Sequence, residues 1–381
     1  MTLALVIALL SLAIWLVLLF GRGVFWRATL DPLPAPPASW PEIIAVVPAR
    51  DEAAVVGDAV ASLLRQDYPG AFRVVLVDDH STDGTGEQAK IAARAVGQGD
   101  RLTVLGARDL PPGWSGKLWA LAEGVRQERD MGSTPAFYLF TDADIVHHPT
   151  NLRELVSRIE AEKLDMASLM VLLRCHSFAE RMLIPAFVFF FAMLYPFRWS
   201  NDRRKSIAAA AGGCILIRRT AYERAGGYEA IRNELIDDCA LAREVKKGGP
   251  IWLGLTQQTR SLRAYPRVGD IWRMVARTAY TQLQYSPLLL AGTVLGMAVT
   301  YVAPPVLAVF GWGLAALVAG IAWVAMAVAF LPMLRFYGRS WVWAPLLPVI
   351  AGVYLLATVD SARRHWRGKG GEWKGRVQLR K

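Results

Sequence analysis

The sequence has few cysteines and no compact metal-binding motif. Three of the 381 residues are cysteine, none forms a C-x-x-C pair, and the five histidines form no H-E-x-x-H pattern. An odd number of unclustered thiols is typical of reduced cysteines in the cytosol. The pattern therefore excludes a disulfide framework and a structural zinc site.

Charged residues are absent from three long stretches, at positions 2–20, 287–334 and 340–359. Hydrophobic residues make up 54% of the chain, whereas roughly 45–50% is usual in soluble globular domains. This composition excludes a disordered chain and a collagen-like fibre. A helical membrane crossing needs about 20 apolar residues. The sequence therefore predicts three or four membrane segments beside a water-soluble block of roughly 250 residues.

The first stretch predicts an N-terminal transmembrane helix over residues 1–21. It has neither a basic region at its start nor an A-x-A cleavage site, and Arg22 and Arg27 follow it. We therefore expect a retained helix whose C-terminal end faces the cytosol. Five prolines then fall within residues 31–41. Because proline-rich chain is stiff and extended, this composition predicts a linker over residues 22–41.

The C-terminal part of the chain, residues 286–360, is expected to hold further membrane helices. We place them at about 287–309, 314–334 and 341–359. A full crossing by the last of them would put the basic tail, residues 361–381, outside the cell, against the positive-inside rule. Because Pro345 and Pro348 interrupt that helix, a crossing and a re-entrant segment both remain open.

The basic tail favours a membrane partner over a nucleic acid. From Arg363 to Lys381 it holds eight Lys or Arg against one Glu, and so supplies +7 of the formal net charge of +11. Basic residues beside a membrane segment are typical of an anchor on anionic lipid. Nucleic-acid binding needs basic and aromatic side chains interleaved on one platform, and the sequence shows no such pattern.

Residues 42–285 alternate between short β-branched runs and helical patterns. Strands are predicted at Ile43–Val47, Phe72–Val77, Leu102–Leu105 and Ala136–Thr141. Such alternation predicts an α/β domain with a mostly parallel sheet, whose ligands bind at the carboxyl ends of the strands. Within this block, residues 182–197 form an uncharged run that is short for a full crossing. An interfacial helix and a buried core helix both remain open for it.

Acidic residues follow two of the predicted strands. Asp78 and Asp79 end the second strand, and Asp142 and Asp144 follow the fourth. Two carboxylates spaced as Asp-x-Asp suit one hard cation shared with phosphate oxygens. A carboxylate at a strand end can also accept a hydrogen bond from the N–H of a nucleobase or from a ribose hydroxyl. Each motif alone is also typical of a solvated turn or a helix cap. Together the two motifs favour a nucleotide-diphosphate site.

A further acidic pair, Asp237-Asp238, opens a predicted helix. Carboxylates at a helix N-terminus are stabilised by the helix dipole, which is the structural interpretation. The catalytic interpretation makes one of them the general base for an acceptor hydroxyl. Upstream, Gly212 and Gly213 either let a ligand approach the backbone closely or form a tight turn before a strand.

The order of these motifs resembles a known family. Between about residues 43 and 280 the chain carries, in order, VVPARDE, VVLVDDHSTDGT, FTDAD, AAGGCILIRR and IDDCALAREVKKGG. This set resembles the inverting family 2 glycosyltransferases, which have a Rossmann-like GT-A nucleotide-diphospho-sugar transferase fold. The flanking membrane helices resemble the lipid-modifying branch that includes ceramide glucosyltransferases. The stretches PPGWSGKLWALAEGV and WKGR are similar to glycosyltransferases associated with bacterial hopanoid biosynthesis.

The resemblance implies specific roles. It implies a nucleotide-sugar site at Pro48, Ala49, Arg50, Glu52, Asp79, Lys117 and Asp142, a metal ligand at Asp144, acceptor contacts at Gly212, Gly213 and Arg277, and a catalytic base at Asp238. It also implies Mg²⁺ or Mn²⁺ as cofactor, a UDP-sugar donor and a lipid acceptor. The implied location is the bacterial inner membrane, crossed several times, with the catalytic domain in the cytosol.

Two departures from the family pattern bear on the alternatives. The acid before the base is Asp237 where the family often has Glu, and only Arg277 matches the Q/R-x-x-R-W motif of many members. The second departure and the few membrane segments argue against a processive polysaccharide synthase. A non-catalytic lipid-binding scaffold with the same fold is the other alternative. It would be supported by lost acids, yet Asp142, Asp144 and Asp238 are all present.

Overall fold

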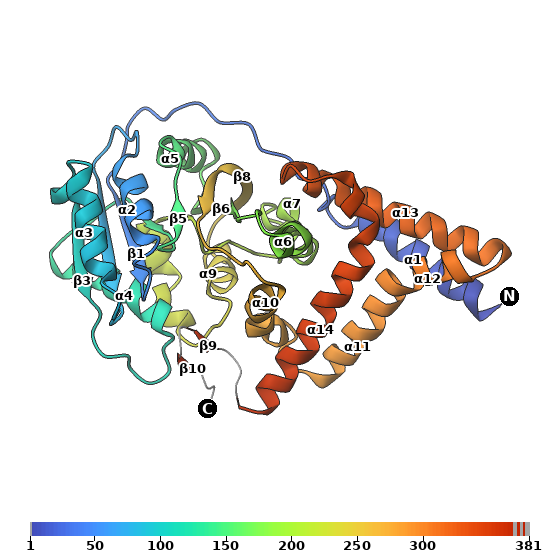
Figure 1. Cartoon of the computed structure of the whole chain (residues 1–381). Helices are drawn as coiled ribbons and strands as arrows, with labels where there is room; N and C mark the ends of the chain where they lie inside the picture. The colour runs from blue at the N-terminus through green and yellow to red at the C-terminus, as the bar shows by residue number, and fades with distance from the viewer. Residues whose placement is uncertain (1, 369–371, 374–375, 378–381) are drawn as a thin grey trace. The chain divides into compact units, whose positions relative to one another are not determined.

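The computed structural model describes residues 2–368, 372–373 and 376–377. The chain divides into two compact units, and its course alternates between them (Figure 1). The sheet unit consists of Leu30–Arg174, Trp199–Arg263 and Trp373–Lys381. The helical unit consists of Met1–Thr29, Cys175–Arg198 and Ala264–Glu372. The predicted domain over residues 42–285 is therefore not one continuous body, because its apolar segment 175–198 belongs to the helical unit.

The sheet unit is built on an eight-stranded sheet with the order β3-β2-β1-β4-β7-β6-β8-β5. The strands are β1 (Ile43–Ala49), β2 (Phe72–Asp78), β3 (Leu102–Gly106), β4 (Phe137–Phe140), β5 (Ile145–Val146), β6 (Met166–Leu172), β7 (Ile215–Arg218) and β8 (Ile251–Ser261). Strands β1 to β4 are parallel, whereas β7 is antiparallel to its neighbours β4 and β6. The predicted α/β class with a mostly parallel first half is confirmed.

Helices cover both faces of this sheet. They are α2 (Val56–Leu64), α3 (Thr85–Ala95), η2 (Gly99–Arg101), α4 (Gly116–Asp130), α5 (Asn151–Glu162), α8 (Arg219–Arg224), η3 (Gly227–Ile231) and α9 (Asp237–Lys246). Along β1, Ile43 and Ala45 pack with α2, α3 and α5, while Ile44 and Val46 pack with α4, α8 and α9. Successive side chains of a strand point to opposite faces. A strand buried on both faces leaves room for polar groups only at its end, where the site lies.

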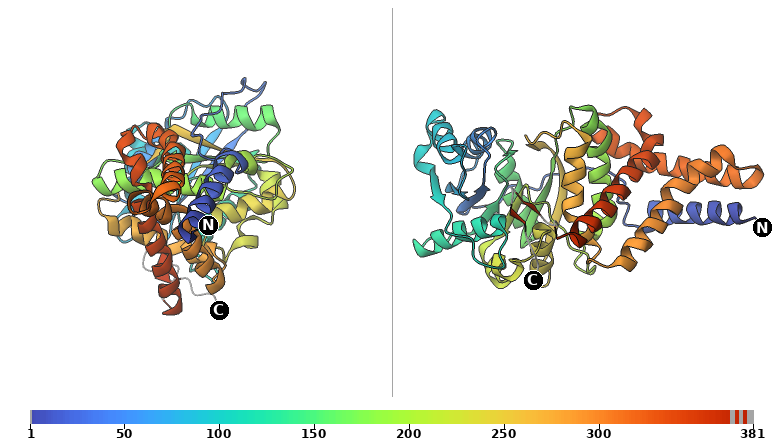
Figure 2. Two further views of the ribbon diagram at one scale, coloured as in Figure 1. Left: turned by 90° about the vertical axis from the view of Figure 1, so that its right-hand side faces the viewer. Right: turned by 60° about the horizontal axis from the view of Figure 1, so that its bottom comes forward.

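The helical unit consists of helices, most of them apolar. They are α1 (Leu3–Leu16), η1 (Val17–Gly21), α6 (Phe178–Leu194), α10 (Val268–Gln282), α11 (Pro287–Met297), η4 (Ala298–Val302), α12 (Ala303–Phe310), α13 (Gly313–Phe336), η5 (Trp341–Leu346) and α14 (Leu347–Trp366). Helix α1 packs along α13, and α10 packs along α14 (Figure 2). A short helix, α7 (Phe197–Ser200), lies where the chain returns to the sheet unit.

Five stretches of the described chain are long and apolar enough to cross a membrane, against three or four expected. They are Leu3–Gly21, Phe178–Ser200, Pro287–Phe310, Gly313–Phe336 and Trp341–Trp366. The last helix continues beyond the expected end at residue 359. Of the basic tail predicted for residues 361–381, residues 369–371, 374–375 and 378–381 lie outside the described residues. The rest comprises the end of α14 and the short ladder of β9 (Glu372–Trp373) and β10 (Arg376–Val377).

The second of these stretches is longer than the 16 uncharged residues counted in the sequence. It has 23 residues, because the helix begins at Phe178, before the charged Glu180 and Arg181. The carboxylate of Glu180 is buried and accepts hydrogen bonds from the backbone N–H groups of His176, Ser177 and Tyr265. This charged residue therefore caps the N-terminus of the helix and does not interrupt it. By length and composition the whole stretch is a candidate span, although α6 itself ends at Leu194, so the interfacial helix and the buried core helix both stay predictions.

A distorted turn in the helical unit has an identifiable cause. Pro304 and Pro305 carry no N–H, so they cannot bond to the carbonyls one turn earlier. Two side chains of α1 use carbonyls in that turn: Ser11 Oγ donates to Val299 at 2.7 Å, and Trp15 Nε1 donates to Thr300 at 2.9 Å. Inside an apolar environment an unpaired backbone carbonyl is costly, so these bonds hold α1 against η4.

Candidate active site

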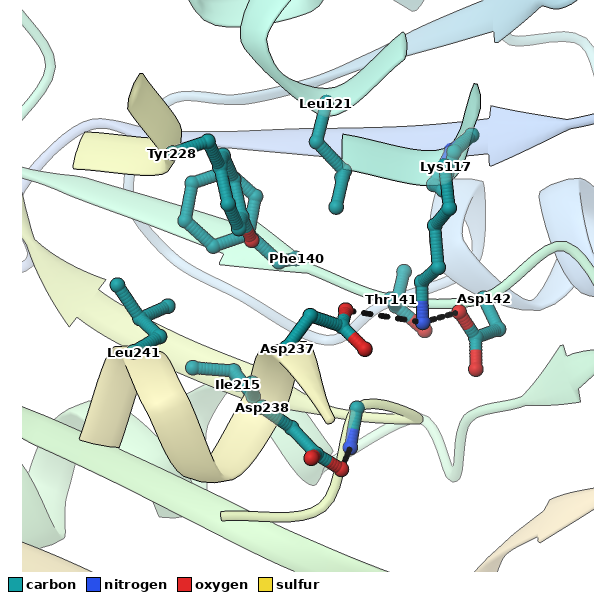
Figure 3. A pocket seen from close by; sticks show the side chains of 12 residues that line it. Lys117, Leu121, Phe140, Thr141, Asp142, Ile215, Tyr228, Asp237, Asp238 and Leu241 are labelled. Atoms are coloured by element: carbon teal, nitrogen blue, oxygen red, sulfur yellow. Dashed lines mark hydrogen bonds and ion pairs between the residues drawn. The ribbon is translucent and has the colours of Figure 1, made fainter. Parts of the chain in front are cut away.

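A pocket of about 260 Å³ opens at the carboxyl ends of β1 and β4 (Figure 3). It is lined by Pro48, Lys117, Leu121, Phe140, Thr141, Asp142, Gly212, Ile215, Tyr228, Asp237, Asp238 and Leu241. These residues come from six elements of the sheet unit or from the loops beside them. Apolar side chains form one wall, and one cation and three carboxylates form the other. Such a mixture of apolar walls and a few convergent polar groups is typical of a ligand site.

Lys117 is the cation of the pocket. It lies in the first turn of α4, whose N-cap Ser115 accepts the N–H of Leu118. Its Nζ lies 2.7 Å from Asp142 Oδ1 and 3.6 Å from Asp237 Oδ2, as the dashed lines of Figure 3 show. Burial lowers the pKa of Lys117, but these two carboxylates outweigh burial and raise it above its ordinary value. The ammonium is therefore charged at every physiological pH and ties the β4 loop to the start of α9.

Asp238 is held by backbone N–H groups. Its Oδ2 accepts from Gly212 N at 2.9 Å, and its Oδ1 accepts from Cys239 N at 2.7 Å. Burial, followed by the charge of Asp237, raises the pKa of Asp238 to about 6. A carboxylate with such a pKa is ionised at neutral pH and is also a stronger base than an ordinary aspartate. The arrangement is suited to accepting a proton from a hydroxyl in the pocket.

Asp144 lies in a second cluster of charges beside β5. Its Oδ2 accepts from Ser261 Oγ at 2.8 Å and from Arg263 Nε at 3.2 Å, and Arg263 also pairs with Glu52. Burial and then the charge of Asp142 raise the pKa of Asp144, against the lowering effect of Arg263. Over residues 2–368 and the short ladder after them, no three His, Cys, Asp or Glu side chains gather as a preformed metal site.

The loops after β1 and β2 are bonded to each other. Arg50 Nη1 donates to the Asp79 carbonyl at 2.6 Å and lies 3.6 Å from the buried carboxylate of the same residue. A second bond joins the same two loops, because Glu52 N donates to Thr85 Oγ1 at 2.8 Å. Together with the neighbouring strand ends, these contacts fix the loops that the resemblance assigns to the nucleoside.

The structure brings together five of the predicted site residues in one pocket: Pro48, Lys117, Asp142, Gly212 and Asp238. The other predicted residues lie elsewhere. Ala49 is buried in β1, and a Cβ at Gly213 would lie 3.0 Å from Val171, so this glycine allows close packing and does not line the pocket. Arg277 lies on α10 in the helical unit and is not part of the pocket that the sheet unit forms.

His147, the histidine nearest the Asp-x-Asp motif, has a structural role. Its Nε2 lies 2.9 Å from Thr141 Oγ1 and its Nδ1 lies 3.0 Å from Asn151 Nδ2. Burial lowers the pKa of His147 to about 3, so the ring is neutral. Both ring nitrogens are engaged in the packing of α5 against β4, which leaves the ring no part in the pocket.

Two residues of functional interest were not predicted: Tyr228 and Arg263. Asp237 was predicted only as one of an acidic pair at a helix start, and its contact with Lys117 was not foreseen. Tyr228 follows Gly226 and Gly227, which adopt φ of 78° and 58°, and a Cβ at Gly227 would lie 2.8 Å from the ring of Tyr222. This Gly-Gly-aromatic pattern is the signal that could have placed Tyr228, because only glycine fits such a turn.

One curated relative matches part of the chain. An uncharacterized protein of Methanocaldococcus jannaschii is 30% identical over 126 residues, which is 33% of this chain and 45% of that protein. The chain thus spans less than half the length of this relative.

Two solved structures match the chain, and the first of them is similar in fold. A mannosyltransferase from Pyrobaculum calidifontis, solved with GDP-mannose and Mn²⁺, is 21% identical, with a TM-score of 0.57 over 95% of this chain and 99% of that one. Glucosyl-3-phosphoglycerate synthase from Mycobacterium tuberculosis is 17% identical, with a TM-score of 0.43 over 67% and 87% of the two chains. The family model for glycosyltransferase like family 2 matches residues 41–260. Because this match covers more than half of the sequence, the chain belongs to glycosyltransferase family 2.

Proposed function

We propose that the protein is a membrane-anchored, inverting glycosyltransferase that moves a sugar from a nucleotide diphosphate, a UDP-sugar, to a hydroxyl of a membrane lipid. The observation that carries the proposal is the position of Asp238. Its carboxylate faces a pocket that also presents Lys117 and Asp142, and two backbone N–H groups fix its direction. A base fixed beside a nucleotide-sugar pocket is the arrangement that a single displacement needs.

The reaction balances with one base and one leaving group. The acceptor oxygen attacks the anomeric carbon while its proton passes to Asp238. The bond between that carbon and the diphosphate oxygen breaks, and the nucleoside diphosphate leaves with the electron pair. Attack from the face opposite the leaving group inverts the anomeric configuration. Lys117, whose charge is kept by its two carboxylate partners, holds the β4 loop and the start of α9 in place during the displacement.

The cluster around Asp144 fits a divalent cation, Mg²⁺ or Mn²⁺. Its buried carboxylate is paired with the guanidinium of Arg263, and this pairing supports a position that accepts positive charge. Mg²⁺ commonly takes one or two carboxylates and completes its shell with water and substrate phosphates. When bound, such an ion offsets the charge of the departing diphosphate. Asp144 would hold it, and Asp142 lies close enough to contribute charge.

A membrane lipid is the proposed acceptor because the helical unit offers five candidate spans. The hopanoid or glycolipid class follows from the resemblance of PPGWSGKLWALAEGV, which in this structure includes the first turns of α4 and therefore Lys117. We place the protein in the bacterial inner membrane with the sheet unit in the cytosol, where nucleotide sugars are made.

The activity test uses the full chain in detergent or nanodiscs. It is incubated with Mn²⁺, bacterial lipid extract and, separately, UDP-glucose, UDP-N-acetylglucosamine and GDP-mannose. We expect one donor to yield a lipid heavier by one sugar, detected by mass spectrometry, and the UDP-sugars to be preferred. Chains of many sugars would point to a processive synthase instead. Nucleotide binding without any glycosylated lipid would favour the non-catalytic scaffold.

The topology test uses cysteine labelling of intact cells. Asp109→Cys, on an exposed loop of the sheet unit, should react with an impermeant thiol reagent only after the cells are opened. Trp312→Cys is the matched control, because this exposed residue lies in the turn between α12 and α13, which we expect outside. Labelling of Asp109→Cys in intact cells would refute the cytosolic assignment.

A further inference from the structure

Arg263 bridges two acidic residues of the proposed metal site. Its Nε lies 3.2 Å from Asp144 Oδ2, and its Nη2 lies 2.5 Å from Glu52 Oε1. The side chains of Asp144 and Glu52 are only 7% and 11% exposed. Carboxylates withdrawn from water need a positive partner. The guanidinium of Arg263 thus occupies the position on Asp144 that a divalent cation would need.

The backbone of this cluster is fixed by strand pairing, while the arginine side chain is partly exposed to solvent. Ile145 pairs with Ser261 across β5 and β8, Leu262 N donates to the Asp144 carbonyl at 2.8 Å, and Arg263 N donates to Ser261 Oγ at 3.2 Å. The Arg263 side chain, by contrast, is 36% exposed. A rotation of that side chain can therefore vacate Asp144 without disturbing the strand.

We infer that Arg263 is a built-in counter-ion that competes with the divalent cation for Asp144 and releases it when the diphosphate of the donor enters. The inference rests on the proposed function, because it needs a cation at Asp144. A guanidinium and a divalent ion repel each other strongly at hydrogen-bond distance in a partly buried site. A diphosphate offers the guanidinium a stronger, bidentate partner. The cation therefore binds weakly alone and tightly together with the nucleotide.

The inference also explains why the cluster is stable without an ion. An unpaired carboxylate as buried as Asp144 would destabilise the fold, and the arginine removes that cost. The order of binding follows: the cation reaches its ligand as part of the nucleotide complex, so the protein does not hold an ion while it lacks a donor.

The test measures Mn²⁺ binding directly by electron paramagnetic resonance, with the full-length protein in detergent. Wild type is compared with Arg263→Ala, Arg263→Lys and Arg260→Ala, each without nucleotide and then with UDP or GDP. Arg260 is the matched control, because it lies near the end of β8, three residues before Arg263, is exposed and carries the same charge. Melting temperatures establish that each variant is folded.

Without nucleotide, Arg263→Ala should bind Mn²⁺ at least about tenfold more tightly than wild type, since a positive charge close to the ion is removed. Arg263→Lys should stay near wild type, and Arg260→Ala should not differ from it. Adding UDP or GDP should tighten Mn²⁺ binding in wild type and reduce the difference in Mn²⁺ affinity between wild type and Arg263→Ala. If Arg263→Ala binds Mn²⁺ no more tightly than wild type, the counter-ion role is overturned.

The double variant Arg263→Ala with Asp144→Asn separates this inference from the proposed function. Loss of the tightened Mn²⁺ binding in the double variant assigns the ion to Asp144 and supports both. Tight binding that survives Asp144→Asn places the ion elsewhere and overturns the role of Arg263 together with the assignment of Asp144 as the metal ligand, while the glycosylation assay still decides the proposed function. Absence of lipid glycosylation despite the expected Mn²⁺ affinities would overturn the lipid acceptor alone and leave the role of Arg263 standing.

Discussion

The surroundings of Asp238 and of Asp144 solve the same physical problem in different ways. Both carboxylates are withdrawn from water, and burial raises the pKa of each. Asp238 receives two backbone N–H groups, which carry no net charge and cannot leave. Asp144 receives a hydroxyl and a guanidinium, and the guanidinium belongs to a partly exposed side chain that can leave.

The difference in partners separates the two chemical roles. Fixed neutral donors orient a carboxylate while its basicity stays high, which suits the transfer of a proton. A charged partner lowers the basicity of a carboxylate and reserves its place for another cation. Under the proposed function, two aspartates of equal intrinsic acidity serve as a base and as a cation ligand because their neighbours differ. The predictions below test this contrast, from the largest expected effect to the smallest.

Asp238→Asn should lower the transfer rate by about 10²–10⁴-fold, the usual contribution of a general base. The amide can still accept the N–H of Gly212 but cannot take the proton of the acceptor. Initial rates of lipid glycosylation should fall while nucleotide affinity stays near wild type. If the variant retains normal turnover, the base lies elsewhere and Asp238 is only a helix-start acid.

Asp144→Asn should lower transfer about 10²-fold or more and should remove its dependence on Mg²⁺ or Mn²⁺, because an ion that neutralises the leaving group is worth several kcal/mol. Chelation of the metal should affect wild type to a similar degree and the variant little. Rates are measured with and without a chelator. If Asp144→Asn is as active as wild type in Mn²⁺, Asp144 does not hold the catalytic ion, and the proposed difference in role between the two aspartates is wrong.

The pH profile should report the base alone. Because the pKa of Asp238 is raised to about 6, kcat/KM should fall about tenfold per pH unit below this value, as the base becomes protonated. Above it the profile should be flat until another group titrates. The acidic limb should be present in wild type and in Arg260→Ala. An acidic limb centred near the pKa of an ordinary aspartate would contradict the raised basicity.

Asp237→Asn should have a milder effect, of roughly fivefold or less on the transfer rate. Asp237 is the more distant of the two carboxylate partners of Lys117, which keeps its 2.7 Å contact with Asp142. Its charge also contributes to the raised pKa of Asp238, so the acidic limb of kcat/KM should move to lower pH. An Asp237→Asn variant that is inactive beside an active Asp238→Asn would exchange the two roles.

The acidic residues at the strand ends could be predicted from the sequence, whereas the arginine partner of Asp144 could not, and the reason is physical. The parallel strands β1, β2 and β4 are continuous apolar runs, and polar residues mark their ends, so Asp79 and Asp142 could be placed from local pattern. Arg263 could not, because it reaches Asp144 across 119 positions of sequence through the antiparallel pairing of β5 with β8. The side chain of Tyr228 depends likewise on a glycine turn that the hydrophobic pattern does not show.

The smallest expected effect is on stability, and it again concerns Asp238. Its folded-state pKa lies above the value of an unfolded aspartate. The ionised form is therefore the disfavoured one in the folded protein. Its stabilising contribution is present in full below pH of about 4 and is lost as the pH rises through about 6. Asp238→Asn, which is neutral at every pH, escapes this loss.

The variant should therefore be more stable than wild type at pH 7.5, by roughly 1–2 kcal/mol, and the difference should nearly vanish at about pH 3.5, below the pKa of an unfolded aspartate. Melting temperatures of the full chain in detergent at the two pH values measure it. Asp109→Asn, on an exposed loop, is the control and should change stability little at either pH. An advantage of equal size at both pH values would show that packing, and not the charge of the base, limits stability here.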